Sequence, residues 1–499
     1  MKILYFFKTY ILVLACLFTF EQVWSKEYSI KTQSRIQLFE NWMETLMEDR
    51  SLPGVSVAIV HGKDLVYSKG FGYSDLANQI PMTKNTSQPI ASITKVFTSI
   101  GLMKLVEGNK INLEDSVVKY IPELKNLKSK KFDINALTLR SILLHTTGLP
   151  LNNKILIKPR INVQNISSRF LEDIKNQKLL FQPNRLHKYS NLGMNLGGIL
   201  IERLSLKKYS KYITDIILNP AGMTSSSFEG NKGLYETMGY SRKISGLRKS
   251  KGYTNMGRLL GLPSSGLNSN VLDISRFISW HFSTLYGDLD NIINRNTLNE
   301  MQTVKWVPIP IEMPPFINSG LAFFANAFEL GGVGLGYFRD KQFIKHSGGL
   351  NGFCSELIMD NENQIGIIVL ANSSDAPIYW NHNSSISKNL YEIIGESLMN
   401  PDYMIQDSLK EYENVYTDHH HFHFYASFVE DKLALFDLSQ SFPMRSPIIL
   451  KKLELDDSFE DPNNHGFYGK EFFVTFQRNS NKEVTSLVLG NNVLMANEK

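Results

Sequence analysis

The chain has 499 residues, of which 42% are apolar and 20% are charged, and its formal net charge at pH 7 is +5. This length allows two or three domains, and the apolar content supports a sizeable core. The small basic excess has no long run of Lys or Arg beyond residues 128–131, so the composition argues against a nucleic-acid partner.

The first 25 residues are predicted to be a secretory signal peptide. Lys2 and Lys8 precede an apolar stretch over residues 10–20, and Ser25 is a small residue in a suitable position for cleavage. The apolar stretch is too short for a comfortable membrane span, so an uncleaved leader that keeps the protein near a membrane is the less favoured interpretation. The residues before Cys16 resemble a lipoprotein processing site, but the apolar residues after it disfavour a lipid anchor.

The chain has two cysteines, Cys16 and Cys354. Removal of the leader would leave one, and therefore no internal disulfide. Export without disulfides fits a bacterial periplasm better than a small disulfide-stapled secreted scaffold. We expect an exported protein, periplasmic or secreted, that is held by its core. Cys354 lies in a predicted core strand and is expected to be a packing residue.

The first predicted elements are a helix and a hairpin. Residues 34–47 carry apolar side chains at helical spacing. Two β-branched runs over 55–60 and 65–68 are separated by four residues, which predicts a hairpin with a four-residue loop. Gly70 to Tyr73 are then expected to lead out of the sheet.

The middle of the chain is predicted to be mainly helical, from Ser92 to about Met223. Residues 141–150 indicate a short helix that ends at Gly148, beyond which Pro150 prevents continuation. Further helices are predicted over residues 192–204, 213–218 and 272–280.

Strands return after Leu321, and together with the early hairpin they predict one antiparallel sheet assembled from both ends of a domain. We therefore predict an α+β fold in which helices flank this sheet and a large helical subdomain packs against it. From about residue 401, alternating strand-like runs predict a separate all-β, barrel-like module. The late strands are predicted over 343–346, 353–359 and 365–370, the closing helix over 387–398, and the domains over 1–25, 26–400 and 401–499.

The residues with the clearest chemical potential are Ser92 and Lys95, at the head of an apolar run that predicts a buried helix. Residues three apart on a helix point the same way. A Ser hydroxyl is a weak nucleophile until a base takes its proton, and a Lys is such a base only when burial lowers its pKa. The S-x-x-K pattern occurs three more times in the chain, so by itself it describes a capping Ser and a solvated Lys equally well.

Two later segments add candidate groups. Tyr189 can act as a second base beside a buried Lys, and Asn191 can donate to a substrate and bridge to the Lys. Residues 345–352 form a glycine-rich strand edge, where a substrate backbone can approach closely and free N–H groups can polarise a carbonyl. The structural alternatives are a half-buried aromatic before a helix for Tyr189 and a strand residue bonded to backbone for His346.

Four motifs occur in the order seen in the serine β-lactamase and penicillin-binding-protein superfamily, and the resemblance covers roughly residues 35–400. The tyrosine in one of them resembles the class C branch, which includes class C β-lactamases, D-peptidases and related esterases. The four motifs are Ser92-Ile93-Thr94-Lys95, Leu144-His145-Thr146-Thr147-Gly148-Leu149, Tyr189-Ser190-Asn191 and His346-Ser347-Gly348-Gly349.

The resemblance implies a mechanism. Ser92 would be the acylated nucleophile, and Lys95 and Tyr189 would share the general-base and general-acid work. The oxyanion hole would be formed by the backbone N–H groups of Ser92 and Gly349, aided by the helix N-terminus. Water would hydrolyse the acyl-enzyme, so no metal or organic cofactor is required, and the partner would be a small-molecule or peptide substrate. Substrate binding would fall to Asn191, His346, Ser347 and Gly348.

One residue departs from the pattern. Class C β-lactamases and many transpeptidases carry Lys at the start of the last motif, where this chain has His346. A Lys is a permanent cation for a substrate carboxylate, whereas a His near neutral pH is mostly uncharged. This favours an exported serine hydrolase acting on an amide or ester. The alternatives are a penicillin-binding D-peptidase or class C-like β-lactamase, and a non-catalytic binding protein, against which the intact Ser92, Lys95 and Tyr189 argue.

Two other patterns are set aside. Residues 419–423 contain four His residues, but no carboxylate or Cys pattern accompanies them, so a solvated strand start is favoured over a metal site. Residues 332–336 are rich in glycine but lack the strand-loop-helix setting of a nucleotide site, and we expect a loop there.

Overall fold

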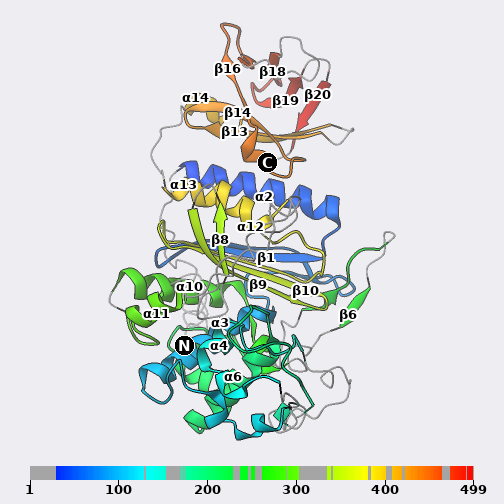
Figure 1. Ribbon diagram of the computed structural model, residues 1–499. Coiled ribbons are helices and arrows are strands. Elements are labelled where there is room, and N and C mark those ends of the chain that lie inside the picture. Colours follow the sequence, from blue (N-terminus) through cyan, green and yellow to red (C-terminus); the bar gives the residue numbers. More distant parts are fainter. Residues whose placement is uncertain are drawn as a thin grey trace, which may run out of the picture. The chain divides into compact units, whose positions relative to one another are not determined.

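The protein is described by a computed structural model (Figure 1). The residues that it describes are 30–127, 131–152, 170–171, 174, 176–228, 237–244, 249–252, 261–287, 289–302, 334–338, 341–379, 384–399, 407–418, 422–462, 473–489 and 492–497. The predicted signal peptide, with Cys16, and His419 to His421 lie outside these residues. The described chain forms two compact units: the larger lies within 40–395 and 438–444, and the smaller within 30–39, 396–437 and 445–499.

A seven-stranded antiparallel sheet forms the centre of the larger unit. Its central strands, β1 and β11, come from opposite ends of this unit and pair along their whole length. Nearly every residue of both is apolar and buried, as expected for strands covered on both faces. This confirms the predicted antiparallel sheet. In spatial order the strands are β3 (Ile80–Pro81), β2 (Asp64–Asp75), β1 (Gly54–His61), β11 (Ile365–Ala371), β10 (Phe353–Asp360), β9 (Lys341–Leu350) and β8 (Gly334–Phe338).

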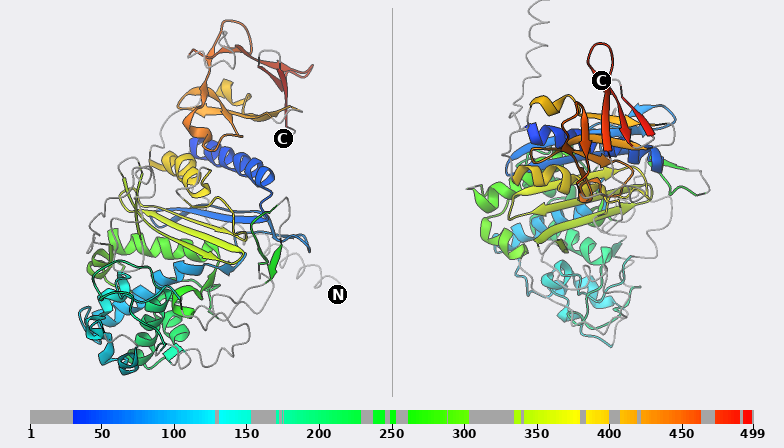
Figure 2. Two further views of the ribbon diagram at one scale, coloured as in Figure 1. Left: turned by 45° about the vertical axis from the view of Figure 1, so that its right-hand side comes forward. Right: turned by 90° about the horizontal axis from the view of Figure 1, so that it is seen from above.

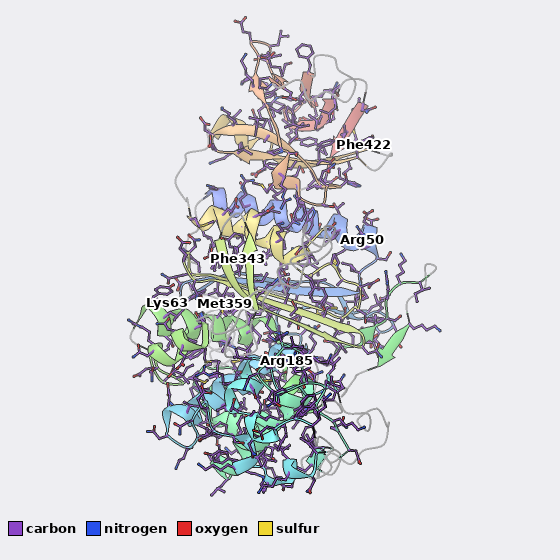
Figure 3. All side chains as sticks on the ribbon, in the orientation of Figure 1. Arg50, Lys63, Arg185, Phe343, Met359 and Phe422 are labelled. Carbon is purple, nitrogen blue, oxygen red and sulfur yellow. The ribbon has the colours of Figure 1, made fainter. Side chains whose placement is uncertain are left out.

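Helices cover both faces of this sheet. Helices α3 and α10 lie on one face and α12 on the other, and the left view of Figure 2 shows the same layers after a turn of 45°. The two faces can be followed on the residues labelled in Figure 3. Met359 of β10 belongs to the large core shared with α3 and α10, whereas Phe343 of β9 packs against Tyr391 on the other side, with ring centroids 5.1 Å apart.

The helical part of the larger unit is built around α3, which is buried along most of its length. Its apolar side chains pack against α6, α9 and α10, which explains why most of the run after Ser92 is apolar. The helices are η1 (Ala91–Ile93), α3 (Thr94–Glu107), η2 (Val117–Lys119), η3 (Pro122–Asn126), η4 (Ile134–Ala136), α4 (Leu139–Leu143), α6 (Asn191–Ser205), α7 (Tyr209–Ile213), the π-helical turn η7 (Thr214–Leu218), α9 (Leu262–Ser265), α10 (Val271–Tyr286), α11 (Arg295–Gln302), α12 (Ile386–Leu390) and the π-helical turn η10 (Tyr391–Gly395). The described residues of this unit also form two short strand pairs: β4 (Gln88–Pro89) with β7 (Asn268–Ser269), and β5 (Gly239–Tyr240) with β6 (Ser250–Gly252).

The first hairpin differs from the sequence prediction. Its loop has two residues, because His61 and Asp64 are paired and Gly62 adopts a left-handed φ of 60°. The predicted departure from the sheet at Gly70 is also wrong, since β2 continues to Asp75. A Cβ at Gly70 would lie 2.3 Å from the carbonyl oxygen of Met82, so the glycine allows a close backbone approach inside the strand.

The helix predicted to end at Gly148 ends earlier. Helix α4 finishes at Leu143, and His145 takes the left-handed position, with φ of 56°. The N–H of Thr146 donates to the Ser141 carbonyl and that of His145 to the Ile142 carbonyl, which is the bonding of a Schellman motif. The glycine belongs to the next turn instead. The loop predicted over 332–336 is likewise wrong from Gly334 onward, where β8 begins.

The smaller unit contains a nine-stranded antiparallel sheet, which confirms the predicted all-β, barrel-like module. Alternate aromatic and aliphatic side chains of its strands form one core. Among the described helices of the chain, none has both the length and the apolar character needed to cross a membrane. The strands in spatial order are β15 (Ile448–Ile449), β14 (Lys432–Asp437), β13 (His423–Val429), β12 (Asn414–Thr417), β20 (Asn492–Ala496), β19 (Val484–Leu489), β18 (Phe473–Arg478), β17 (Ser458–Glu460) and β16 (Lys451–Lys452). The other helices in the described part of the chain are α2 (Ile30–Arg50), α13 (Glu396–Met399), α14 (Asp407–Lys410) and η11 (Pro443–Arg445).

Candidate active site

Ser92 lies in the short 3-10 turn η1, which runs directly into α3. The turn is tied to its surroundings through Ile90, whose N–H donates to the Leu267 carbonyl at 3.0 Å and whose carbonyl accepts from Ser355 Oγ at 2.7 Å. Ala91 adopts a left-handed φ of 50°, which is unusual for a residue with a Cβ. Ser92 is thereby presented, half-buried, at a position fixed by both the sheet and the α9–β7 connection.

The Lys95 amine is the immediate neighbour of the Ser92 hydroxyl. Lys95 Nζ lies 3.0 Å from Ser92 Oγ and donates to the Ser264 carbonyl at 2.6 Å. The side chain is fully buried, and within the described part of the chain no carboxylate forms an ion pair with it. Burial therefore holds the pKa of Lys95 well below its usual value of 10.5. This is the environment that a Lys needs in order to accept the proton of Ser92.

Tyr189 lies on the other side of the same amine. Lys95 Nζ is 4.9 Å from the centroid of the Tyr189 ring, and the phenol lies close enough to the Ser92 side chain for Ser92 to affect its pKa. Burial raises the pKa of Tyr189, and the effect of Ser92 opposes this only in part. The ionised phenol is thus disfavoured, so this geometry suits a proton donor better than the second base suggested by the sequence.

The last motif lies on β9, whose side chains alternate between the two faces of the sheet. His346 is buried close to Lys95, and its Nδ1 lies 2.8 Å from the Ser347 carbonyl. Burial and the nearby Lys95 lower the pKa of His346 to about 3, so this ring is neutral at physiological pH. Ser347 faces the opposite side, where its hydroxyl donates to Glu356 Oε1 at 3.2 Å. The predicted substrate contact of Ser347 is therefore restricted to its backbone.

Gly348 and Gly349 bring β9 against the turn that carries Ser92. A Cβ at Gly348 would lie 2.3 Å from the carbonyl oxygen of Ile90, so only glycine permits this contact. Gly349 is exposed at the strand edge, and Tyr379 Oη donates to the Gly348 carbonyl at 3.0 Å. The two predicted oxyanion donors, the N–H groups of Ser92 and Gly349, consequently belong to two elements in direct contact.

Asn191 begins α6, next to the N-cap Ser190. Its Nδ2 donates to Asn152 Oδ1 at 2.7 Å, while its Oδ1 is buried and has no hydrogen-bond partner among the described residues. The bridge from Asn191 to Lys95 that the sequence suggested does not form within this part of the chain. The Ser264 carbonyl takes that place on the amine instead.

The sequence did not single out Ser264, Asn152 or His145 as functional residues. Ser264 acts through its backbone carbonyl, which leaves no residue-type signal. His145 was visible only as part of a motif. Its ring packs on Tyr189 with centroids 4.5 Å apart, and its Nδ1 accepts from the Ser190 N–H at 3.2 Å.

Comparison of the chain with known proteins identifies relatives in sequence and in fold. The model of the family described as Beta-lactamase matches residues 39–380. Protein flp of Staphylococcus aureus (strain MRSA252) is 28% identical over 349 residues, which is 68% of this chain and 64% of that protein. A protein of Salmonella typhimurium named putative D-alanyl-D-alanine carboxypeptidase is 29% identical over 208 residues, or 39% of this chain and 47% of that protein. The chain thus spans less than two thirds of the length of these curated relatives.

Two solved structures share the fold. The octameric penicillin-binding protein homologue from Pyrococcus abyssi superposes with a TM-score of 0.59 at 24% identity, over 92% of this chain and 99% of that one. The D-amino acid amidase from Ochrobactrum anthropi SV3 gives 0.56 at 21% identity, over 73% of this chain and 99% of that one. At these identities the two structures are evidence for the fold alone.

Proposed function

Because the chain belongs to the Beta-lactamase family, we propose that it is a serine hydrolase that cleaves an amide or ester bond through an acyl intermediate on Ser92. One observation carries the proposal: a fully buried Lys amine without a described acidic partner lies 3.0 Å from the hydroxyl of a half-buried Ser. A lysine kept only for structure would gain more from a counter-ion or from solvent.

In the proposed reaction, Ser92 Oγ attacks the carbonyl carbon of the substrate while its proton passes to Lys95 Nζ. The N–H groups of Ser92 and Gly349 stabilise the oxyanion that forms. Tyr189 gives its proton to the leaving amine or alcohol as the tetrahedral intermediate collapses, and Lys95 then reprotonates the phenol. A water molecule then attacks the acyl carbon and gives a proton to Lys95. As the second tetrahedral intermediate collapses, Tyr189 gives its proton to the departing Ser92 Oγ and Lys95 reprotonates the phenol, which releases the acid and restores Ser92.

The chemistry around the last motif supports a substrate without a carboxylate at that position. His346 is neutral, and Lys345, the nearest cation along the strand, lies on the face of the sheet that carries Glu356. A neutral amide or ester fits such a wall better than an anion that must be paired. The amidase named above acts on amides, which agrees with this class. Export by the predicted leader is part of the same proposal.

A second candidate function is a penicillin-binding D-peptidase or a class C-like β-lactamase, favoured by the names of the Salmonella and Pyrococcus relatives. A labelled penicillin separates these possibilities by intact mass. A stable adduct supports the peptidase, rapid release supports the β-lactamase, and no reaction leaves the amide or ester hydrolase.

The direct test is a panel of D-amino acid amides, short esters and acyl-D-alanyl-D-alanine peptides, assayed with the wild type and Ser92→Ala. Ser99→Ala is a matched control, because Ser99 is a fully buried serine on α3 whose hydroxyl makes no hydrogen bond among the described residues. We expect the Ser92 variant to lose hydrolysis and the Ser99 variant to keep it. Hydrolysis that survives Ser92→Ala would place the chemistry elsewhere.

A further inference from the structure

The ring of His145 lies beside Tyr189 and is only 3% exposed, yet the proposed mechanism gives it no role. Its backbone sits at the left-handed position of the Schellman motif after α4. Glycine is preferred there, because a Cβ crowds the following carbonyl in this conformation. A strained position occupied by a bulky side chain calls for a compensating contact.

That contact is made with the residues on both sides of Tyr189. The carbonyl of His145 accepts from the Lys188 N–H at 2.8 Å, and its Nδ1 accepts from the Ser190 N–H at 3.2 Å. The ring itself packs on the Tyr189 ring at an interplanar angle of 39°. His145 therefore accepts hydrogen bonds from the two backbone N–H groups that flank Tyr189 and contacts the face of the Tyr189 ring.

The charge state of His145 is fixed by the same geometry. Because Nδ1 accepts a hydrogen bond from a backbone N–H, the ring must be neutral and carry its proton on Nε2. Burial keeps the pKa of His145 well below its usual value, and the neighbouring Lys95, His187 and His346 act in the same direction. Burial is the largest of these effects and does not depend on the charge of Lys95, so it favours the neutral acceptor in each protonation state of Lys95.

We propose that His145 is a positioning residue that fixes the Tyr189 phenol at Ser92. This inference rests on the proposed function, in which Tyr189 delivers a proton to the leaving group. The left-handed turn after helix α4 carries the imidazole, and the imidazole accepts a hydrogen bond from the backbone that leads into α6. Without the ring, Tyr189 keeps its place in the chain but loses the contacts that orient it.

Two substitutions separate this role from a merely structural one. His145→Gly suits the left-handed backbone and removes the ring, whereas His145→Asn tolerates that backbone and offers Oδ1 as an acceptor for the Ser190 N–H. We expect His145→Gly to lower kcat about 100-fold, a loss that a 1 Å misplacement can cause, with little change in KM. Because the lost ring leaves a cavity that lowers the melting temperature, kcat is measured well below that temperature. His145→Asn should recover part of that loss. Leu206→Gly is the matched control: it replaces another left-handed residue, 90% exposed at the end of α6, and should leave kcat unchanged.

The outcome is decided on two readouts. Wild-type kcat in His145→Gly, or a loss of activity that only tracks unfolding in both variants, overturns the proposal. A crystal structure of His145→Gly gives an answer that does not depend on turnover: we expect the Tyr189 hydroxyl to move away from Ser92 Oγ, and an unmoved phenol overturns the inference. Failure of the proposed function is recognised separately, because the wild type and Ser92→Ala would then behave alike on the substrate panel.

Discussion

The position of the Lys95 amine depends on a glycine in a different helix. Pro263, which precedes Ser264, packs on α6 at Gly198, where an added Cβ would lie 2.0 Å from Pro263 Cγ. A proline ring cannot swing aside as a flexible side chain does. Gly198→Ala should therefore push α9 away from α6, and with it the Ser264 carbonyl that accepts from Lys95 Nζ at 2.6 Å.

The size of the effect follows from these distances. An ordinary contact begins at 3.4 Å, so α9 must move by roughly 1.4 Å if it takes up the whole displacement. A shift of that size takes the Lys95–Ser264 contact out of hydrogen-bond range. We expect overpacking to cost about 1–3 kcal/mol, offset in part by the roughly 1 kcal/mol that a helical Ala gains over Gly. The misplaced amine should lower kcat/KM about 100-fold.

Gly193→Ala on the same helix is the matched control. The nearest atom to its added Cβ is Thr147 Cγ2 at 3.5 Å, an ordinary contact, so this variant should be unchanged or stabilised by about 0.5–1 kcal/mol and fully active. Urea denaturation and steady-state kinetics on both variants make the comparison. Equal stability and equal kcat/KM for the two variants would refute the claim that α6 sets the Lys95 amine through Pro263.

Three further variants test other parts of the account. Lys95→Arg places a permanently protonated group at the base position, so the rate of Ser92 acylation should fall at least about 100-fold. Acylation of this variant at the wild-type rate would rule out Lys95 as the base. Tyr379→Phe removes the hydrogen bond to the Gly348 carbonyl, which should lower the free energy of unfolding by about 1 kcal/mol in urea denaturation and lower kcat a few-fold. No change in either quantity would show that this bond does not fix the position of β9. His281 is buried with its pKa lowered to about 4, so the unfolded state binds its proton first as the pH falls below about 6.5 and stability is lost down to the folded pKa. Removing that proton uptake with His281→Gln should reduce the loss of unfolding free energy between pH 7 and pH 4 by about 3 kcal/mol, and an unchanged pH dependence of urea denaturation would contradict the assignment.

Much of the fold and the candidate site could be predicted because the relevant signals lie in residue types. The apolar, β-branched runs of β1 and β11 marked the centre of the sheet, and the apolar residues after Ser92 marked the helix that buries Lys95. The order of the four motifs then indicated which residues the fold would bring together. Their catalytic and binding roles remain predictions until the variants are measured.

The features that could not be predicted depend on backbone geometry. The Ser264 carbonyl would be an acceptor with any side chain, so its identity as Ser carries no information. Gly148 gave a strong helix-end signal, yet His145 took the left-handed position because its ring compensates for the strain there. The orientation of Ser347, in contrast, was available from strand alternation, since its neighbour His346 was assigned to the site.

The most direct measurement is the location of the acyl group during turnover. The protein would be mixed with the best substrate of the panel, quenched in acid within the first turnover, digested and analysed by peptide mass spectrometry. The account predicts one acylated peptide, with the acyl group on Ser92, in the wild type and in Ser99→Ala, and none in Ser92→Ala. An acyl group on another residue, or hydrolysis with no covalent intermediate at any quench time, would contradict it.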